Sequence, residues 1–382
     1  MNSENRSGKP PLVETLKEGL DAPICLTWEL TYACNLACVH CLSSSGRRDP
    51  NELSTAEALR VVDEFAAMDV FYVNIGGGEP LVRRDFWTIL DHAVERKVGV
   101  KFSTNGTRLG APEARRLAGT DYVDVQISLD GVDAATNDAL RGEGTWVAAR
   151  DAMAALTEAG FEGFKISVVT TRHNADQMDD LLAIADEHGA QLRVTRLRPS
   201  GRGADVYLDL RPTQDQQRRL YTWLLDHPQV LTGDSFFHLS ALGESLPGLN
   251  LCGAGRVVCL IDPVGDVYAC PFVIHDEFLA GNVRDPGGFT RVWRESELFT
   301  ELREPGSAGA CASCGSYDAC QGGCMAAKFF TGIPLDGPDP DCVFGHGDEA
   351  IAGIDATATP RPSQDHSRPG ALVPVALSRK PG

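Results

Sequence analysis

Between residues 25 and 230, short apolar segments rich in β-branched residues alternate with longer stretches in which apolar positions recur at helical spacing. The repeated strand-helix unit predicts a parallel sheet with right-handed crossovers. There are six units, two fewer than in a closed barrel, so we expect an α/β fold built on a partial (β/α)6 barrel of the TIM type. The predicted strands are residues 25–30, 70–78, 98–106, 122–131, 165–174 and 192–201, and the predicted helices are residues 54–68, 85–96, 112–118, 145–159, 176–188 and 213–228.

Polar or glycine-rich loops follow these predicted strands. In parallel α/β folds the loops after the strands meet at one edge of the sheet, where ligands bind. The sequence therefore predicts a single site at this edge, formed by residues 31–46, GGGEP at 76–80, STNG at 103–106, SLDG at 128–131 and RPSGRG at 198–203.

The cysteines indicate how the chain is divided. Cys34, Cys38 and Cys41 form one group, and eight more cysteines follow between residues 252 and 342. We therefore expect an N-terminal segment, a barrel, a bridging segment, a cysteine-rich domain and a tail, at residues 1–24, 25–230, 231–251, 252–347 and 348–382. The tail is rich in Pro, Ser and Ala without apolar periodicity, which predicts disorder.

Charge and composition narrow the class of protein. A formal net charge of -18 with no cluster of Lys and Arg argues against a nucleic-acid partner. No apolar segment has the length of a signal peptide or of a membrane span. We expect a cytoplasmic protein without a membrane association. Its 12 cysteines are then metal ligands or redox groups rather than disulfides.

Three thiolates at the spacing of Cys34, Cys38 and Cys41 suit a [4Fe-4S] cluster that leaves one iron without a protein ligand. That iron can bind a cofactor or a substrate. The alternative is a zinc site, since His40 lies in the same loop and would complete a set of four ligands.

The residues CNLACVHC resemble the CxxxCxxC signature of radical SAM enzymes, and GGGEP resembles their GGE motif. The resemblance implies that the open iron binds S-adenosylmethionine (SAM) and that reductive cleavage yields a 5'-deoxyadenosyl radical. It also implies SAM contacts: the amino group at Gly77, Gly78 and Glu79, the ribose at Asn105, Ser128 and Asp130, the carboxylate at Arg141, and the adenine at His40.

The second cysteine group resembles the SPASM extension of radical SAM enzymes, through its C-x2-C-x5-C-x3-C run followed by a distant cysteine. A pair of zinc ribbons is the alternative. The resemblance implies two auxiliary [4Fe-4S] clusters, three in all, with interleaved ligands: Cys252, Cys259, Cys270 and Cys324 for one, Cys311, Cys314, Cys320 and Cys342 for the other. Cys25 is left over, and we expect it to be a core residue.

Longer segments, among them FYVNIGGGEP, RLRPSGRGADV and LCGAGRVVCLIDPVGDVYACPF, resemble the mycofactocin branch of radical SAM peptide maturases. The resemblance implies an oxidoreductase or lyase that decarboxylates the C-terminal tyrosine of a short precursor peptide ending in Val-Tyr and then joins the two residues by a carbon-carbon bond. The partners implied are a small peptide-binding chaperone and an electron donor such as a ferredoxin or flavodoxin. About 25 residues before the first strand are too few for a leader-binding domain, which also favours a separate chaperone.

Two other functions stay open on the sequence. One is a radical SAM dehydrogenase or crosslinking maturase of another peptide or protein. Sulfatase-type dehydrogenases carry an aspartate after the third auxiliary cysteine, whereas Pro271 follows Cys270 here, which argues against that subgroup. The other is a zinc-binding module without catalysis. We expect Phe236 and Phe237 to be core residues, and Arg196 and Arg198 to point into the barrel.

Overall fold

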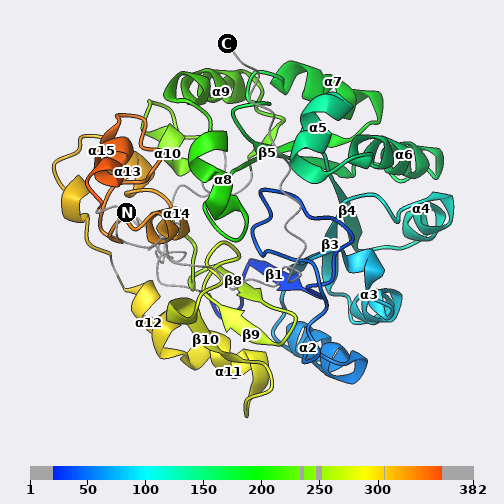
Figure 1. Cartoon of the computed structure of the whole chain (residues 1–382). Helices are drawn as coiled ribbons and strands as arrows, with labels where there is room; N and C mark the ends of the chain where they lie inside the picture. Colours follow the sequence, from blue (N-terminus) through cyan, green and yellow to red (C-terminus); the bar gives the residue numbers. More distant parts are fainter. Residues whose placement is uncertain (1–19, 233–235, 247–251, 305, 355–382) are drawn as a thin grey trace, which may run out of the picture.

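The computed structural model describes residues 20–232, 236–246, 252–304 and 306–354, which contain one curved sheet of ten strands (Figure 1). The strand order is β10-β9-β8-β1-β2-β3-β4-β5-β6-β7. Strands β8 and β1 to β7 run parallel, and β9 and β10 are antiparallel to their neighbours. The strands are β1 (Cys25–Glu29), β2 (Tyr72–Gly76), β3 (Gly99–Thr104), β4 (Val123–Ser128), β5 (Lys165–Thr170), β6 (Gln191–Arg196), β7 (Leu231–Thr232), β8 (Val258–Ile261), β9 (Asp266–Tyr268) and β10 (Leu279–Asn282).

Helices form an outer ring around the sheet, and the loop after β1 lies over the middle of that ring (Figure 1). The six predicted helices are confirmed to within three residues: α2 (Thr55–Ala67), α3 (Phe86–Glu95), α4 (Ala111–Ala118), α6 (Thr145–Glu158), α7 (Met178–Glu187) and α9 (Gln214–Asp226). Two further helices were not predicted: α5 (Ala134–Arg141) and α8 (Gly203–Leu210). Both are short, and α5 owes its start to an N-cap, since the Asp133 side chain accepts a hydrogen bond from the Thr136 N–H.

The alternation of side chains along β1 separates the core from an inner, polar face. Leu26 and Trp28 point outward and are almost fully buried, and Trp28 packs edge-to-face on Phe65 of α2 at 5.5 Å between ring centroids. Thr27 and Glu29 point inward and line a cavity. The lumen of the partial barrel is therefore polar, while the apolar core lies between the strands and the helices.

The cysteine-rich segment continues the sheet, because β8 pairs with β1 in parallel register. Its remaining helices are α11 (Gly288–Glu295), α12 (Glu297–Arg303), α13 (Tyr317–Cys320), α14 (Met325–Phe330) and α15 (His346–Ala352), with 3-10 turns η2 (Asp276–Phe278) and η3 (Gly309–Cys311); η1 (Pro80–Val82) and α10 (Phe237–Ser240) precede them. Helix α15 crosses the expected start of the tail at residue 348, so that boundary was too early. The expected disorder beyond it concerns mostly residues 355–382, which lie outside the described residues.

An ion-pair cluster joins the barrel to the cysteine-rich segment. Arg196 at the end of β6 donates to Asp341 at 2.8 Å and also binds Asp339, and all three side chains are buried. Arg196 and Arg198 both line the cavity, as expected, although the Arg196 guanidinium is paired with these two aspartates. The Arg198 guanidinium lies 4.2 Å from the centroid of the Phe272 ring.

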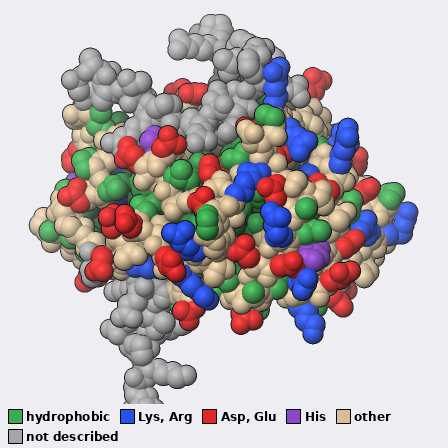
Figure 2. All heavy atoms as spheres, turned by 90° about the horizontal axis from the view of Figure 1, so that it is seen from below, with side chains coloured by type: hydrophobic (Ala, Val, Ile, Leu, Met, Phe, Trp, Pro, Cys, Tyr) green, Lys and Arg blue, Asp and Glu red, His purple; other side chains and the backbone are tan. Residues whose placement is uncertain are grey.

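The face shown in Figure 2 carries acidic and basic side chains interspersed rather than gathered by sign. Within the described ranges, no helix is long and apolar enough to cross a membrane.

Candidate functional site at the mouth of the partial barrel

One cavity of about 500 Å³ extends from the loop after β1 through the lumen to the cysteine-rich segment. Its lining includes cysteines from both groups and inward-facing polar residues of β1 to β6. The cysteines of the lining are Cys25, Cys34, Cys38, Cys41, Cys252, Cys270 and Cys324. The structure therefore brings the three-cysteine loop and three of the eight cysteines of the second group to the same space.

Two glycines of GGGEP hold the backbone of the cysteine loop. A Cβ atom at Gly78 would lie 2.1 Å from the Ala33 carbonyl oxygen, and one at Gly77 would lie 2.6 Å from the Thr31 oxygen. Gly77 also has a φ of +110°, which side chains rarely adopt. The Gly78 N–H donates to the Thr31 oxygen at 2.7 Å. Gly77 and Gly78 line the cavity, but their lack of a side chain is required by the loop itself.

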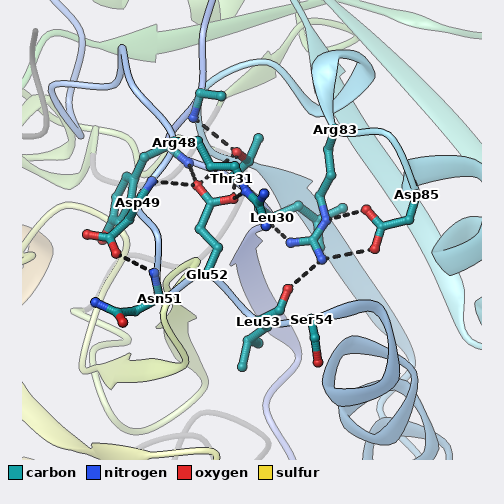
Figure 3. A network of polar contacts seen from close by, with 12 residues as sticks. Leu30, Thr31, Arg48, Asp49, Asn51, Glu52, Leu53, Ser54, Arg83 and Asp85 are labelled. Atoms are coloured by element: carbon teal, nitrogen blue, oxygen red, sulfur yellow. Dashed lines mark hydrogen bonds and ion pairs between the residues drawn. The ribbon is translucent and has the colours of Figure 1, made fainter.

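A network of buried polar contacts fixes the base of the same loop (Figure 3). The Glu52 carboxylate accepts hydrogen bonds from the Thr31 hydroxyl at 2.9 Å and the Tyr32 N–H at 2.8 Å. Arg83 donates to the Leu53 carbonyl oxygen at 2.7 Å and forms an ion pair with Asp85. Glu52 and Arg83 were not predicted from the sequence, because neither belongs to a recognisable motif.

Glu79 lies below the cavity surface rather than in it. Its side chain is 1 % exposed and accepts hydrogen bonds from the Thr104 hydroxyl, the Asn105 N–H and the Leu81 N–H, at 2.8, 2.8 and 3.1 Å. Burial raises its pKa, which these bonds partly offset. In this arrangement Glu79 positions the STNG loop.

Asp130 also lies below the cavity surface, where it contacts other protein groups. It is fully buried and forms ion pairs with Arg141 at 2.6 Å and His40 at 3.0 Å, while the Val169 N–H donates to its other oxygen at 2.7 Å. Burial alone would raise the pKa of Asp130, but Arg141 and His40 lower it well below its usual range. Asp130 thus forms a buried link that fixes His40 and Arg141, which both line the cavity.

Asn105 and Ser128 do lie at the cavity wall, as expected for residues that meet a ligand. The Asn105 amide donates to the Asn35 side-chain oxygen of the cysteine loop at 3.1 Å, and its own oxygen accepts from the Thr107 hydroxyl at 2.6 Å. In the described part of the chain, the Ser128 hydroxyl makes no hydrogen bond. Of the residues predicted to contact the ribose, Ser128 is therefore the one whose hydroxyl is available to a ligand.

The thiols of the cysteine loop lie close enough together to raise one another's pKa. Burial, together with the neighbouring thiols, raises the pKa of Cys34 to about 12 and that of Cys38 to about 11. Such thiols become thiolates when a metal binds them. Among the described residues, no three His, Cys, Asp or Glu side chains meet closely enough to hold a single metal ion.

The four cysteines predicted for the second auxiliary cluster are brought together. They line a separate cavity of about 460 Å³, and burial together with mutual repulsion raises the pKa values of three of them. These four are Cys311, Cys314, Cys320 and Cys342.

The set predicted for the first auxiliary cluster is only partly brought together. Cys252, Cys270 and Cys324 line the large cavity, but Cys259 does not. Cys259 is in register with Leu26, so its thiol points outward with the Leu26 side chain, into the apolar core. Burial raises its pKa well above the usual value, and Arg303 of α12 is the cation that opposes this rise.

Cys25 is not a core residue, and that expectation is wrong. It is exposed and lines the lumen, because it shares the inward face of β1 with Thr27 and Glu29. Phe236 and Phe237 are buried in the core as expected, and they also line the cavity.

Two charged lumen residues, Glu29 and Lys101, were missed. Glu29 is 3 % exposed, and burial with the nearby Asp262 raises its pKa to about 8. Lys101 is 7 % exposed, and burial with the nearby Arg193 lowers its pKa to about 8. Each of them is a charged residue within a predicted apolar strand. Such a residue could have been predicted to face the lumen, because alternate side chains of a strand point to opposite faces of the sheet.

Comparison with known proteins agrees with this geometry. Residues 28–185 match the Radical SAM superfamily, and residues 252–315 match an iron-sulfur cluster-binding domain, SPASM. The fold is similar to that of Streptococcus suis SuiB bound to S-adenosylmethionine, with a TM-score of 0.68 at 21% identity over 85% of this chain and 78% of SuiB. It is also similar to SuiB bound to its precursor peptide SuiA, with a TM-score of 0.66 at 20% identity over 81% of this chain and 73% of SuiB.

Closer similarity is found in sequence. The chain is 66% identical to mycofactocin maturase MftC of Mycolicibacterium smegmatis, over 96% of this chain and 94% of that protein. It is 64% identical to MftC of Mycobacterium tuberculosis H37Rv, over 97% and 96%. By contrast, the AdoMet-dependent heme synthase of Methanosarcina barkeri is 29% identical over 86% of this chain and 98% of that protein. The chain therefore belongs to the mycofactocin maturases of the radical SAM superfamily.

Proposed function

We propose that this chain oxidatively decarboxylates the C-terminal tyrosine of a precursor peptide ending in Val-Tyr, and then links the valine and the former tyrosine by a carbon-carbon bond. One observation carries the proposal beyond the family. A single polar cavity joins the three-cysteine loop to three cysteines of the second group, so a peptide end in it would lie between two redox sites.

The proposal assigns three [4Fe-4S] clusters and SAM. Cys34, Cys38 and Cys41 hold the SAM-binding cluster, and Cys311, Cys314, Cys320 and Cys342 hold one auxiliary cluster. For the other, Cys252, Cys270 and Cys324 face the cavity, and Cys259 serves the core. When bound, the SAM cluster supplies a 5'-deoxyadenosyl radical that abstracts hydrogen from carbon.

The first reaction balances as a two-electron oxidation of the peptide. The tyrosine Cβ gives up a hydrogen atom, the Cα–carboxylate bond breaks with release of CO2, and one electron leaves the peptide as the Cα–Cβ double bond forms. The second reaction leaves the peptide's oxidation level unchanged. The valine Cβ gives up a hydrogen atom, bonds to the alkene carbon, and the resulting radical gains one electron and one proton. An auxiliary cluster would accept the electron of the first reaction.

The chain's own residues have distinct tasks in this scheme. Ser128 and Asn105 lie where they would bond the ribose, and Arg141 and His40 are fixed at the wall by Asp130. Glu79 holds the Asn105 loop from beneath. Burial of Phe236 and Phe237 at the cavity wall keeps water from a carbon radical.

The proposed partners follow from the same scheme. The precursor peptide would be presented by a small peptide-binding chaperone, and a ferredoxin or flavodoxin would supply electrons. The radical chemistry would belong to residues 25–230 and the auxiliary clusters to residues 252–347, joined by residues 231–251, in a cytoplasmic enzyme.

The test is an anaerobic incubation of the reconstituted chain with SAM, dithionite, the chaperone and a precursor peptide ending in Val-Tyr, followed by mass spectrometry. We expect the peptide to lose CO2 and two hydrogen atoms, with one 5'-deoxyadenosine formed per event. Formation of 5'-deoxyadenosine with an unchanged peptide, under conditions where the chaperone binds the peptide, would contradict the assigned reaction. A peptide ending in Val-Phe is the matched control for the terminal residue.

A further inference from the structure

Lys101 of β3 places a buried positive charge inside the lumen. It is 7 % exposed, lines the cavity, and lies in register with Asn74 of β2. Within the described part of the chain, its ammonium group makes no hydrogen bond and no ion pair. The nearest aromatic partner is the Tyr72 ring, whose centroid is 5.7 Å from Nζ. Buried lysines are almost always paired, so this one lacks an anion.

The surrounding charges do not supply that anion. Asp124 of β4 lies in register with Lys101, but its carboxylate is in an ion pair with Lys165 of β5. Burial lowers the pKa of Lys101 and Arg193 of β6 lowers it further, whereas Cys25 and Asp124 offset this only in part. The positive charge of Lys101 is therefore available to a ligand in the cavity.

Two side-chain amides on the strands that flank β3 add hydrogen-bond acceptors to the same cavity. Gln126 of β4 is 6 % exposed; its Nε2 donates to the Ser103 hydroxyl at 2.9 Å, and its buried Oε1 has no partner. The buried Oδ1 of Asn74 likewise has no partner, and both residues line the cavity. A buried acceptor without a donor destabilises the fold. The lumen thus presents one cation and two acceptors on three adjacent strands.

We propose that this lumen site, formed by Asn74, Lys101 and Gln126, binds the C-terminal residue of the peptide, with Lys101 paired to its terminal carboxylate. The amides accept hydrogen bonds from N–H or O–H groups of the same residue. This inference rests on the proposed function, because it requires a substrate that reacts at its last residue. It gives the enzyme a means of selecting a free terminus, since an internal residue has no main-chain carboxylate.

Direct binding tests the site without turnover. The probes are acetyl-Gly-Val-Tyr as the free acid and as the C-terminal amide, titrated into reconstituted full-length protein without reductant. We expect the amide to bind about tenfold more weakly than the acid, as for loss of one charged hydrogen bond. The variant Lys101→Met should bind acid and amide equally. Equal binding of both by the parent protein, or retained preference in the variant, would overturn the proposal.

A footprint on the parent protein covers the case in which Lys101→Met does not fold. Lysine acylation followed by peptide mass spectrometry should show Lys101 protected by the acid and not by the amide, while the exposed Lys97 reacts equally in all samples. Protection by neither peptide contradicts the proposal. If the acid preference holds but a Val-Tyr precursor is never converted, the lumen site stands and the proposed reaction fails. If the precursor is converted but the acid preference is absent, the proposed reaction stands and the lumen site fails.

Discussion

The Glu79 carboxylate accepts a 2.8 Å hydrogen bond from the backbone N–H of Asn105, and so connects the loops after β2 and β3 from inside the fold. Glu79 also accepts from the Thr104 hydroxyl. In the surroundings that the structure gives it, this motif residue is a positioning residue. It holds Asn105 at the cavity wall, and Asn105 in turn donates to Asn35 of the cysteine loop.

We predict that Glu79→Gln weakens SAM binding by about tenfold or more while the iron content stays unchanged. The amide places an N–H group against a donor, and a lost charged hydrogen bond costs about 1.5–3 kcal/mol. Equilibrium binding of SAM to the reconstituted protein measures this. Glu113→Gln, at the exposed start of α4, is the control. Unchanged SAM affinity in Glu79→Gln would contradict the positioning role.

The network of Figure 3 predicts an effect on the first cluster. Replacing Glu52 by Gln removes a buried charge that accepts from Thr31 and Tyr32. We expect the iron content after reconstitution to fall from about twelve per chain toward about eight, with loss of SAM cleavage. Iron analysis and 5'-deoxyadenosine formation measure this. Full iron content with normal SAM cleavage would show that the loop does not depend on Glu52.

The outward position of Cys259 predicts that replacing Cys259 and replacing Cys270 have different effects on the iron content. Cys259→Ala should keep about twelve irons per chain, whereas Cys270→Ala should lose about four, because only Cys270 faces the cavity. Iron analysis and Mössbauer spectroscopy of both variants compare them. The prediction fails if Cys259→Ala loses as much iron as Cys270→Ala.

Arg196 predicts a large effect on stability. Its buried ion pairs with Asp339 and Asp341 join β6 to the cysteine-rich segment, and Asp339 also accepts from the Cys324 N–H at 2.7 Å. Arg196→Met leaves two buried carboxylates, so we expect destabilisation by about 3–5 kcal/mol. Thermal unfolding of the reconstituted protein would register it. The control Arg219→Met breaks an exposed ion pair with Asp176 and should change stability by about 0.5 kcal/mol or less.

The burial of Glu29 predicts that the stability difference between the parent protein and Glu29→Gln depends on pH. Burial and Asp262 raise its folded pKa to about 8, above the unfolded value near 4.5. Between these values the unfolded chain ionises and the folded chain does not, so Glu29 destabilises the fold increasingly as the pH rises. Glu29→Gln should therefore match the parent Tm at pH 4.5 and exceed it at pH 8. A Tm difference that does not grow with pH would contradict the raised pKa.

The strands and long helices follow from the sequence because their apolar periodicity is strong, as in β3 and α9. Helix α5 was missed because its stability depends on one N-cap and on packing against α6, which a window of eight residues does not reveal. The pairing of β8 with β1 joins residues more than 200 positions apart, and local pattern carries no information on it.

Within the site, the sequence predicted which loops meet but not where each side chain points. Glu79 and Asp130 have the residue types that bind SAM, yet both are buried in contacts that become visible only when neighbouring strands are paired. Cys259 fits the cysteine spacing, but its register on β8 determines toward which face of the sheet its side chain points. Lys101 belongs to no motif, and its importance comes from the strands on either side.

The most direct test of the proposed function uses a precursor peptide whose terminal tyrosine carries deuterium at Cβ. Incubated anaerobically with the reconstituted chain, SAM, reductant and the chaperone, it should lose CO2 and transfer one deuterium to 5'-deoxyadenosine, both seen by mass spectrometry. Deuterium-free 5'-deoxyadenosine, formed while the peptide keeps its carboxylate, would contradict the assignment of this cavity to tyrosine decarboxylation.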